Sequence, residues 1–189
     1  MPDWDAVDDV QLLKQAQYGS AEAFGELYER HALSVFRFLY AHLDDRLDAE
    51  DLTEEVFLRT WRTLSRYRDQ GVPFKAFLFR VAHNALIDHY RANRRTRSEV
   101  SIEDSVIHDL RSEPGSQFLQ NQEHQELRNT LAQLREDYQT VLISRFLVGL
   151  SPDETAQVMG RSVGAVRVLQ HRALSALRKL MEGIITDGD

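Results

Sequence analysis

The segment from Phe74 to Arg97 constrains the fold of this chain more than any other. Its apolar residues recur at helical spacing and predict one continuous buried face. They are Phe74, Phe77, Leu78, Val81, Ala82, Ala85 and Leu86, and the segment then ends on Arg91, Arg94, Arg95 and Arg97. The pattern predicts a helix with one buried side and a cationic tip. Taken alone, this is a core helix with a solvated basic end.

The composition excludes several classes of protein. The chain has 189 residues, of which 42% are hydrophobic and 28% charged, typical of one globular domain or two small ones. It has no cysteine, so neither a disulfide framework nor a thiolate zinc site is expected. No apolar run is long enough to span a bilayer, and the acidic stretch Met1–Asp9 is unlike a signal peptide. We expect a cytoplasmic protein without stable membrane insertion.

Charge is distributed unevenly along the chain. The net charge is −7, but residues 1–57 hold four basic and fourteen acidic side chains, whereas residues 74–97 hold six basic and one acidic. Residues 98–126 are acidic again, and residues 161–181 hold five basic side chains and no acid. Because contact with phosphates needs a local cationic surface rather than a basic protein, the two basic blocks are candidates for nucleic-acid contact.

Apolar spacing predicts helices along most of the chain, so we expect an all-α fold. The expected helices are Asp9–Tyr18, Ala21–Leu43, Asp48–Tyr67, Gln122–Leu134, Tyr138–Phe146, Pro152–Met159 and Val163–Met181, besides the one that begins at Phe74. Val10, Leu13 and Ala16 are expected on the inner side of the first, and Trp61 is expected in the core.

Acidic residues crowd the start of the expected helix Asp48–Tyr67. They are Asp48, Glu50, Asp51, Glu54 and Glu55. Carboxylates at a helix N-terminus stabilise it by about 0.3–1 kcal/mol each through the helix dipole. The dipole does not require so many of them, so a docking surface for a basic partner is the alternative interpretation.

The C-terminal segment has the pattern of a helix-turn-helix. Ser151, Pro152 and Glu154 form a capping-box sequence, and Gly160 separates the short helix from the next one. The second helix begins with small residues and then offers hydrogen-bond donors to a major groove. Two short helices around a glycine also occur in ordinary bundles, so the pattern alone leaves both possibilities open.

Three segments together resemble bacterial sigma factors of the extracytoplasmic-function (ECF) group. Phe77–Arg91 resembles their promoter-melting segment, and Asp48–Trp61 resembles their polymerase-binding helix. Leu150–Met159, followed by Val163–Arg167, resembles their C-terminal helix-turn-helix. The resemblance implies two helical domains, a sigma region 2 bundle and a region 4 helix-turn-helix, and the partners core RNA polymerase, promoter DNA and an anti-sigma factor. It implies no cofactor and no metal.

The resemblance also implies site residues in the first domain. Polymerase binding falls on Asp48, Asp51, Glu54 and Glu55. Contact with the −10 element falls on Tyr67, Arg68, Phe74, Arg80, Asn84, Asp88, Arg91, Arg94 and Arg95. In this assignment the loop between Tyr67 and Phe74 takes up a flipped base, Asn84 reads a base edge, and the arginines hold phosphates.

Recognition of the −35 element is implied for the second helix of the helix-turn-helix. The residues are Arg161, Ser162, Gly164, Ala165, Arg167, Gln170, His171 and Arg172. Family members often carry arginine where this chain has Leu169 and Leu174, which leaves the −35 sequence open.

The resemblance divides the chain into four parts. Residues 1–97 correspond to region 2 and residues 123–182 to region 4, with an acidic linker at 98–122 and an acidic tail at 183–189. The linker is expected to lie in the polymerase channel that nucleic acid also uses, or to be a solvated tether.

Two other functions fit parts of the sequence. His108–Asp109 is a pair used by helical metal phosphohydrolases, but it falls in the expected linker and no further catalytic motif accompanies it, so we expect no enzyme. A stand-alone helix-turn-helix regulator remains the alternative. It would have no use for the acidic helix or for the aromatic-rich segment that begins at Phe74.

Overall fold

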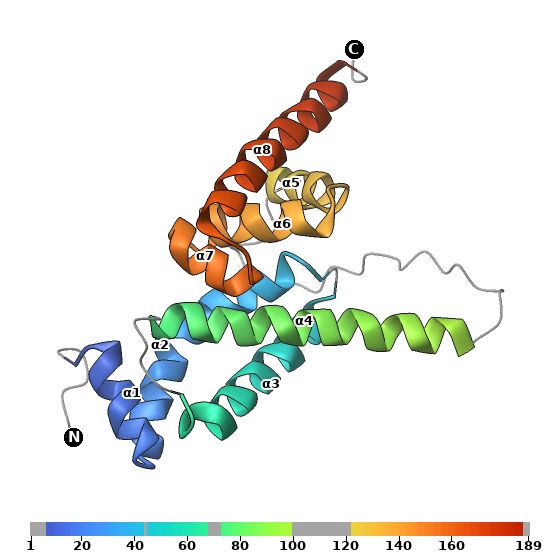
Figure 1. The fold of residues 1–189 in the computed structure, drawn as a ribbon. Coiled ribbons are helices and arrows are strands. Elements are labelled where there is room, and N and C mark those ends of the chain that lie inside the picture. Colours follow the sequence, from blue (N-terminus) through green and yellow to red (C-terminus); the bar gives the residue numbers. More distant parts are fainter. Residues whose placement is uncertain (1–6, 44, 68–72, 100–121, 187–189) are drawn as a thin grey trace.

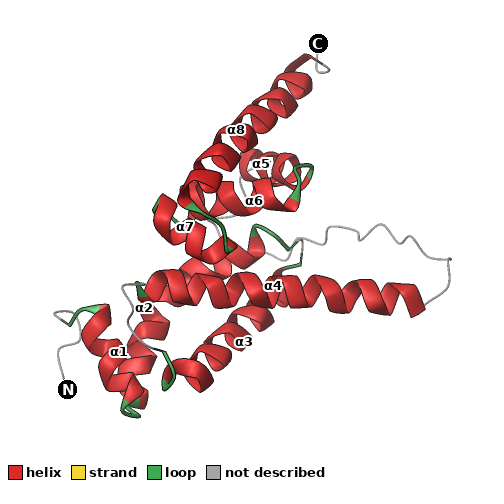
Figure 2. Cartoon of the chain, in the orientation of Figure 1, coloured by secondary structure: helices red, strands yellow, loops and turns green. Residues whose placement is uncertain are grey.

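The structure is a computed structural model that describes residues 7–43, 45–67, 73–99 and 122–186, with side chains omitted at 94–99, 122–126 and 183–186. Within these residues every regular element is helical, which confirms the all-α prediction (Figure 2). The elements are α1 (Asp9–Gln17), α2 (Ala21–Tyr40), α3 (Arg46–Leu64), α4 (Phe74–Glu99), α5 (Gln122–Ala132), α6 (Glu136–Leu142), the π-helical turn η2 (Ile143–Leu147), α7 (Pro152–Met159) and α8 (Val163–Thr186). No described helix is long and apolar enough to cross a membrane.

The N-terminal helices begin at side-chain caps and are joined by an ion-pair cluster. The Asp8 and Ser20 side chains accept hydrogen bonds from the first turns of α1 and α2. Asp9 of α1 then binds Arg30 at 3.1 Å and His31 at 2.6 Å on α2. The expected inner position of Val10 was wrong, because Val10 is 46% exposed while Leu12 is fully buried.

The N-terminal core lies between α2, α3 and α4. Its centre holds Phe38 and Phe79, both fully buried, whose rings meet edge to face with centroids 5.5 Å apart. The predicted apolar face of α4 is largely confirmed, since Phe74, Leu78, Ala82, Ala85 and Leu86 are buried in this core and Phe77 and Val81 are partly buried against it. Most of the stability of these helices comes from this packing, at about 1.5–3 kcal/mol for each large apolar side chain buried.

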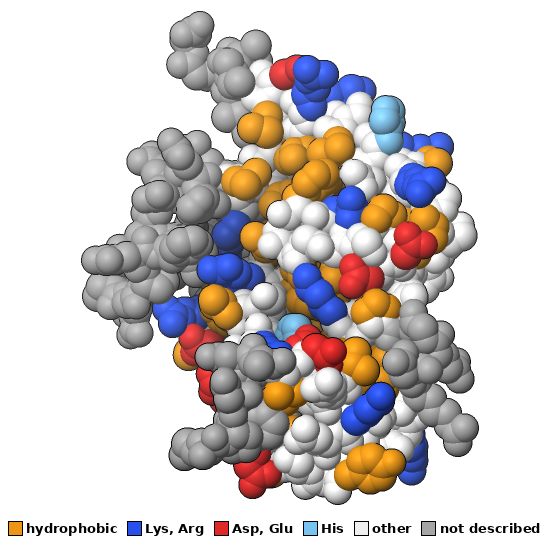
Figure 3. All heavy atoms as spheres, turned by 90° about the vertical axis from the view of Figure 1, so that its left-hand side faces the viewer, with side chains coloured by type: hydrophobic (Ala, Val, Ile, Leu, Met, Phe, Trp, Pro, Cys, Tyr) orange, Lys and Arg blue, Asp and Glu red, His pale blue; other side chains and the backbone are white. Residues whose placement is uncertain are grey.

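The C-terminal helices build a second, smaller core. It consists of Leu134, Val141, Leu142, Ala156, Val166 and Ala173. The helix expected from Tyr138 to Phe146 instead ends at Leu142 and continues as η2, whose wider turn leaves Phe146 61% exposed. Figure 3 shows hydrophobic and cationic side chains interspersed over the upper part of the molecule, at the level of these helices.

The two halves are in direct contact. Helix α7 lies across α4, and α8 points away from the N-terminal helices (Figure 1). Ile143, Leu150 and Val158 of the C-terminal half are buried in the N-terminal core rather than in their own.

Candidate nucleic-acid and polymerase interfaces

The N-terminus of α3 presents the acidic cluster. Asp45 caps the helix, and its side chain accepts hydrogen bonds from the backbone amides of Leu47 at 2.7 Å and Asp48 at 3.1 Å. Because the cap already satisfies two orphan amides of the first turn, the carboxylates that follow are not needed as caps. They are available for other contacts.

These carboxylates differ in their partners. Glu55 accepts from Arg59 at 2.8 Å on the same helix, and Asp48 lies 3.7 Å from His89 of α4. Asp51 and Glu54 are exposed and form no ion pair with any residue that the structure describes. Four carboxylates were expected to bind polymerase. Of these, Asp51 and Glu54 are the two that a basic side chain of a partner can bind without displacing a partner within the chain.

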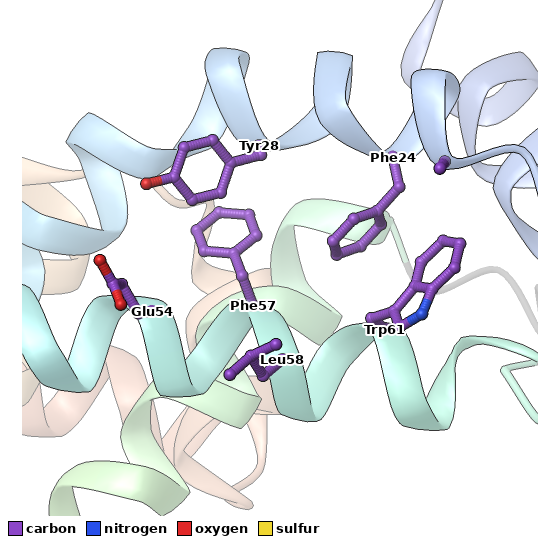
Figure 4. A pocket seen from close by; sticks show the side chains of 7 residues that line it. Phe24, Tyr28, Glu54, Phe57, Leu58 and Trp61 are labelled. Atoms are coloured by element: carbon purple, nitrogen blue, oxygen red, sulfur yellow. The ribbon is translucent and has the colours of Figure 1, made fainter.

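An apolar groove runs beside Glu54, between α2 and α3 (Figure 4). It is lined by Ala21, Phe24, Tyr28, Glu54, Phe57, Leu58 and Trp61. The rings of Phe24 and Trp61 lie 4.8 Å apart, and those of Tyr28 and Phe57 are also 4.8 Å apart. Leu58 is 55% exposed, so the groove presents apolar surface to solvent.

The sequence did not predict this groove. Trp61 was expected in the core, but it is 37% exposed at the groove, and Tyr28 is equally exposed. Large aromatic residues at helical spacing predict burial, and the spacing alone does not tell a core from a groove between two helices. An exposed apolar groove with an acidic rim is a typical protein-binding surface.

Helix α4 carries an exposed polar stripe on the side away from the core. Arg80, Asn84, Asp88 and Arg91 are all exposed, and their spacing places them one above another along the helix. The structure thus brings together four of the residues expected at the −10 element. The stripe offers two guanidinium groups and an amide to a nucleic acid.

Asp88 is the only carboxylate in this stripe, and it is bound to α3. Arg59 contacts Asp88 at 2.9 Å and Glu55 at 2.8 Å, so one guanidinium joins the acidic cluster to the α4 stripe. The hydrogen bonds that Arg59 donates to Asp88, and to a smaller extent those it donates to Glu55, raise the pKa of Arg59 above its ordinary value. The pairing offsets the charge of Asp88, which would otherwise repel phosphates.

The remaining residues expected at the −10 element are placed differently. Phe74 is buried in the core, and Tyr67 is half-buried with its ring centroid 4.7 Å from that of Phe77. Both therefore flank the connection between α3 and α4 rather than project from it. Arg68 lies outside the described residues, as do the side chains of Arg94 and Arg95.

The helix-turn-helix begins and turns as its sequence predicted. Ser151 and Glu154 form the capping box of α7, with hydrogen bonds of 3.1 and 2.7 Å. Gly160 has φ 62° and ψ 36°, and the amide of Arg161 returns to the carbonyl of Ala156 at 2.9 Å. This is a Schellman motif, and its left-handed position explains the glycine. Ser162 caps α8 by accepting from the amide of Ala165 at 3.2 Å.

The exposed face of α8 contains most of the residues expected at the −35 element. Gly164, Ala165, Arg167, His171 and Arg172 are exposed. Val168, 52% exposed, lies on the same face one turn after Gly164 and was missed, although its spacing was a usable signal. A valine methyl group can contact the methyl group of thymine.

Two of the expected −35 residues have partners within the chain. Gln170 is half-buried, and its amide oxygen accepts from Arg145 Nε at 3.1 Å. Because a guanidinium only donates, this contact fixes the orientation of the amide. Arg161 contacts Asp137 of α6 at 2.8 Å. Arg145 also donates to the Leu150 carbonyl, which ties η2 to the start of α7.

Comparison with known protein families assigns the two halves. The family Sigma-70 region 2 matches residues 27–96, and Sigma-70 region 4 matches residues 124–177. The chain belongs to the sigma-70 family. Among its relatives, the ECF RNA polymerase sigma factor BldN of Streptomyces coelicolor is 35% identical over 180 residues, which cover 95% of this chain and 68% of BldN. The chain is thus an alternative sigma factor of the ECF group.

Solved structures show the same fold. CnrH, in complex with the cytosolic domain of CnrY, matches with a TM-score of 0.71 at 28% identity, over 93% of this sigma factor and 97% of CnrH. The sigma factor RpoE of Bartonella quintana, in complex with the anti-sigma factor NepR, matches with a TM-score of 0.68 at 22% identity, over 86% of this chain and 98% of RpoE. Within the described part of the sigma factor, no cluster of side chains could hold a metal ion.

Proposed function

We propose that this sigma factor docks on core RNA polymerase through the groove between α2 and α3 and the carboxylates of Asp51 and Glu54. The groove supplies the apolar contact area, and the carboxylates select a partner surface that carries basic side chains. The partner that fits is a polymerase helix with apolar residues along one side and cations beside them. In this assignment residues 1–97 act as region 2, residues 123–182 as region 4, and residues 98–122 as the linker.

The DNA contacts follow from the two exposed helical faces. The α4 stripe of Arg80, Asn84 and Arg91 would lie against the −10 element, where the arginines neutralise phosphates and Asn84 reads a base edge. The face of α8 that carries Arg167 and His171 would enter the major groove of the −35 element.

The arrangement around α3 carries the proposal. This helix bears the groove on the side that faces α2, and its Arg59 reaches the α4 stripe on the other side. This one helix therefore lies between the proposed polymerase surface and the proposed DNA surface. Both can be occupied at once, as transcription initiation requires of a sigma factor.

Transcription in vitro tests the function directly. The sigma factor, added to core polymerase, is expected to direct initiation from genomic fragments at defined start sites that share −10 and −35 sequences. Asn84→Ala should relax base preference within the −10 element, whereas Asn93→Ala, an exposed amide farther along α4, should not. Tight binding to duplex DNA without any association with core polymerase would instead indicate a stand-alone regulator.

We further propose a cytoplasmic location, where core polymerase works, no catalytic activity of its own, and control by an anti-sigma factor. The last part is supported by RpoE, which was solved with the anti-sigma factor NepR, and by CnrH, which was solved with the cytosolic domain of CnrY. Affinity purification of the tagged sigma factor from its own cells, with identification of a small protein that blocks its transcription in vitro, would test this control.

A further inference from the structure

Val168 lies at the centre of the exposed face of α8, and its side chain is 52% exposed. One helical turn before it lie Gly164 and Ala165, both exposed. One turn after it lie His171 and Arg172, which are also exposed. These four are residues of α8 that the −35 element is expected to meet. Val168 is therefore surrounded by the proposed DNA-binding face rather than placed at its edge.

The fold of region 4 does not explain this valine. The core of region 4 takes Val166 and Ala173 from α8, and Leu169 packs against that core. Among the residues that the structure describes, Val168 belongs to neither hydrophobic core and is not packed against one. Valine is also a weaker helix former than alanine, because its branched side chain loses freedom in a helix. Its contribution is therefore expected in a contact outside the chain.

Gly164 indicates that another molecule approaches α8 closely at this point. Its φ lies outside the left-handed region, and a Cβ added to it would meet no atom within 4 Å. Neither the backbone conformation nor packing inside the chain therefore requires a glycine here, although glycine is a poor helix former. The missing side chain leaves room on the exposed side of α8, one turn from Val168, for DNA to lie against the helix.

Two polar contacts anchor α8 to the elements that pack against it. Arg161, just before the helix, binds Asp137 of α6 at 2.8 Å. The Gln170 amide oxygen accepts from Arg145 Nε of η2 at 3.1 Å. The Gln170 side chain is thereby engaged within the chain, while that of Val168, two residues earlier, is exposed on an anchored helix.

A valine side chain distinguishes the bases by one feature. In the major groove thymine presents a C5 methyl group, whereas guanine, adenine and cytosine present hydrogen-bonding groups without a methyl group. Valine has no side-chain donor or acceptor, so it gains by covering a methyl group and loses by covering a polar edge that water would otherwise bind. Because a helical valine has one strongly preferred rotamer, its methyl groups are presented at a fixed position.

We propose that Val168 reads one thymine of the −35 element through the C5 methyl group of that base. Arg167 and Arg172 beside it supply hydrogen bonds to phosphates or to neighbouring bases, and Gly164 lets α8 come close enough for the apolar groups to touch. The proposal rests on the proposed function, because it requires this face of α8 to enter the major groove of the −35 element.

Deoxyuridine in place of thymidine tests the contact, because it removes the C5 methyl group and keeps every hydrogen bond of the base pair. Each thymine of the −35 element, on either strand, is replaced singly in a promoter that the sigma factor transcribes. The affinity of the holoenzyme for each promoter is then measured by competition. At one position the affinity should fall about fourfold, as expected when one buried methyl group is lost.

Val168→Ala should abolish this dependence on the methyl group. Its affinity for the thymidine promoter should be about fourfold lower than that of the unsubstituted protein, and replacement of the critical thymine should cause no further loss. Alanine is the better helix former, so the variant should remain folded, which circular dichroism checks. Val10→Ala, the same change at an exposed position of α1, should leave both the affinity and the thymine preference unchanged.

The salt dependence of binding separates this contact from a phosphate contact. Val168→Ala should leave the salt dependence unchanged, because valine neutralises no phosphate, whereas Arg167→Ala should reduce it.

Full affinity for every deoxyuridine promoter would overturn the role of Val168, as would a −35 element without thymine. A loss that persists undiminished in Val168→Ala would also overturn it, since another residue would then read the methyl group. Failure of the sigma factor to initiate at any defined promoter would overturn the proposed function as well. Specific initiation that ignores the methyl group would therefore count against Val168 alone.

Discussion

Arg59 and Asp88 join α3 to α4 through an ion pair of 2.9 Å, and Arg59 also binds Glu55 at 2.8 Å. All three side chains are at least one-third exposed, so the pair contributes no more than about 1 kcal/mol to stability. The ion pair matters instead for surface charge. The Arg59 guanidinium offsets the negative charge of two carboxylates, Glu55 of the acidic cluster and Asp88 of the α4 stripe.

Asp88→Asn should therefore strengthen DNA binding without weakening the fold. The substitution removes a negative charge from the α4 stripe and releases Arg59 toward phosphates. We expect tighter binding of a −10 single strand by the holoenzyme, measured by fluorescence anisotropy, and a change of less than about 1 kcal/mol in the free energy of unfolding. Weaker binding would mean that Asp88 itself accepts a hydrogen bond from DNA.

Asp51→Asn together with Glu54→Gln should weaken the complex with core polymerase. These two carboxylates have no ion-pair partner among the described residues, so their charge is available to a basic partner surface. We expect a loss of about 1–3 kcal/mol in binding free energy, measured by titration of labelled sigma factor with core polymerase. Glu55→Gln is the matched control and should cost less, because Glu55 is bound to Arg59. Equal losses of binding free energy would show that the ion pair with Arg59 does not determine whether a carboxylate can bind polymerase.

Arg167 and Gln170 should behave differently in −35 recognition, although both were expected to contact DNA. Arg167 is exposed, so Arg167→Ala should weaken binding and reduce the salt dependence by about one phosphate contact. Gln170→Ala should instead lower the thermal stability of region 4, because the Gln170 amide accepts from Arg145. Base preference at each −35 position, measured by competition, should then be unchanged. Altered base preference in the Gln170 variant would show that Gln170 does contact DNA bases.

Acidification should weaken the contact between the two halves of the chain through His42. The ring Nδ1 donates to the Phe38 carbonyl at 2.8 Å, which leaves Nε2 to accept from Thr140. Burial lowers the pKa of His42 from 6.5 to about 4, and His83 of α4 adds a smaller lowering. The pKa of His83 is itself lowered by burial, against an opposing effect of Asp137.

The direction of the pH effect follows from these pKa shifts. A base whose pKa is lowered by the contact between the halves binds more protons when the halves separate. The contact is therefore fully favoured above pH 6.5 and loses that advantage as the pH falls toward about 4. Within this window the ratio of separated to packed halves should rise up to about tenfold per pH unit for each proton taken up. Energy transfer between dyes attached at Ser65→Cys and Ser175→Cys, one exposed position in each half of a chain without native cysteine, measures this ratio. His42→Gln should flatten the profile, whereas His171→Gln on the exposed face of α8 should not.

The helices were predictable because their signals are local. The spacing of Leu78, Ala82 and Leu86 predicted the buried face of α4, and Ser151 and Glu154 predicted the start of α7, because caps and periodicity depend on residues a few positions apart. The exposed stripe of α4 is the complement of its buried face and followed from the same period.

The interfaces were less predictable because they depend on distant parts of the chain. Nothing in the spacing of Val158 distinguishes it from Ala156, yet one is buried in the core of region 2 and the other in that of region 4. Trp61 has the period of a core residue, but the ring that it meets, Phe24, comes from α2, and a groove stays open between α2 and α3. The bond from Arg145 to Gln170 joins η2 to α8, and helical spacing does not reveal it.

The burial of Leu150 and Val158 in the core of region 2 has a consequence for the behaviour of concentrated protein. The surface around Leu150 and Val158 fits a second copy of region 2 as well as it fits its own, because the two copies are identical. Two molecules could therefore exchange their C-terminal halves and form a dimer in which every contact between the halves occurs twice. Packing within one molecule is independent of concentration, whereas exchange is second order in protein. The same surface would thus limit how far the sigma factor can be concentrated while it remains monomeric.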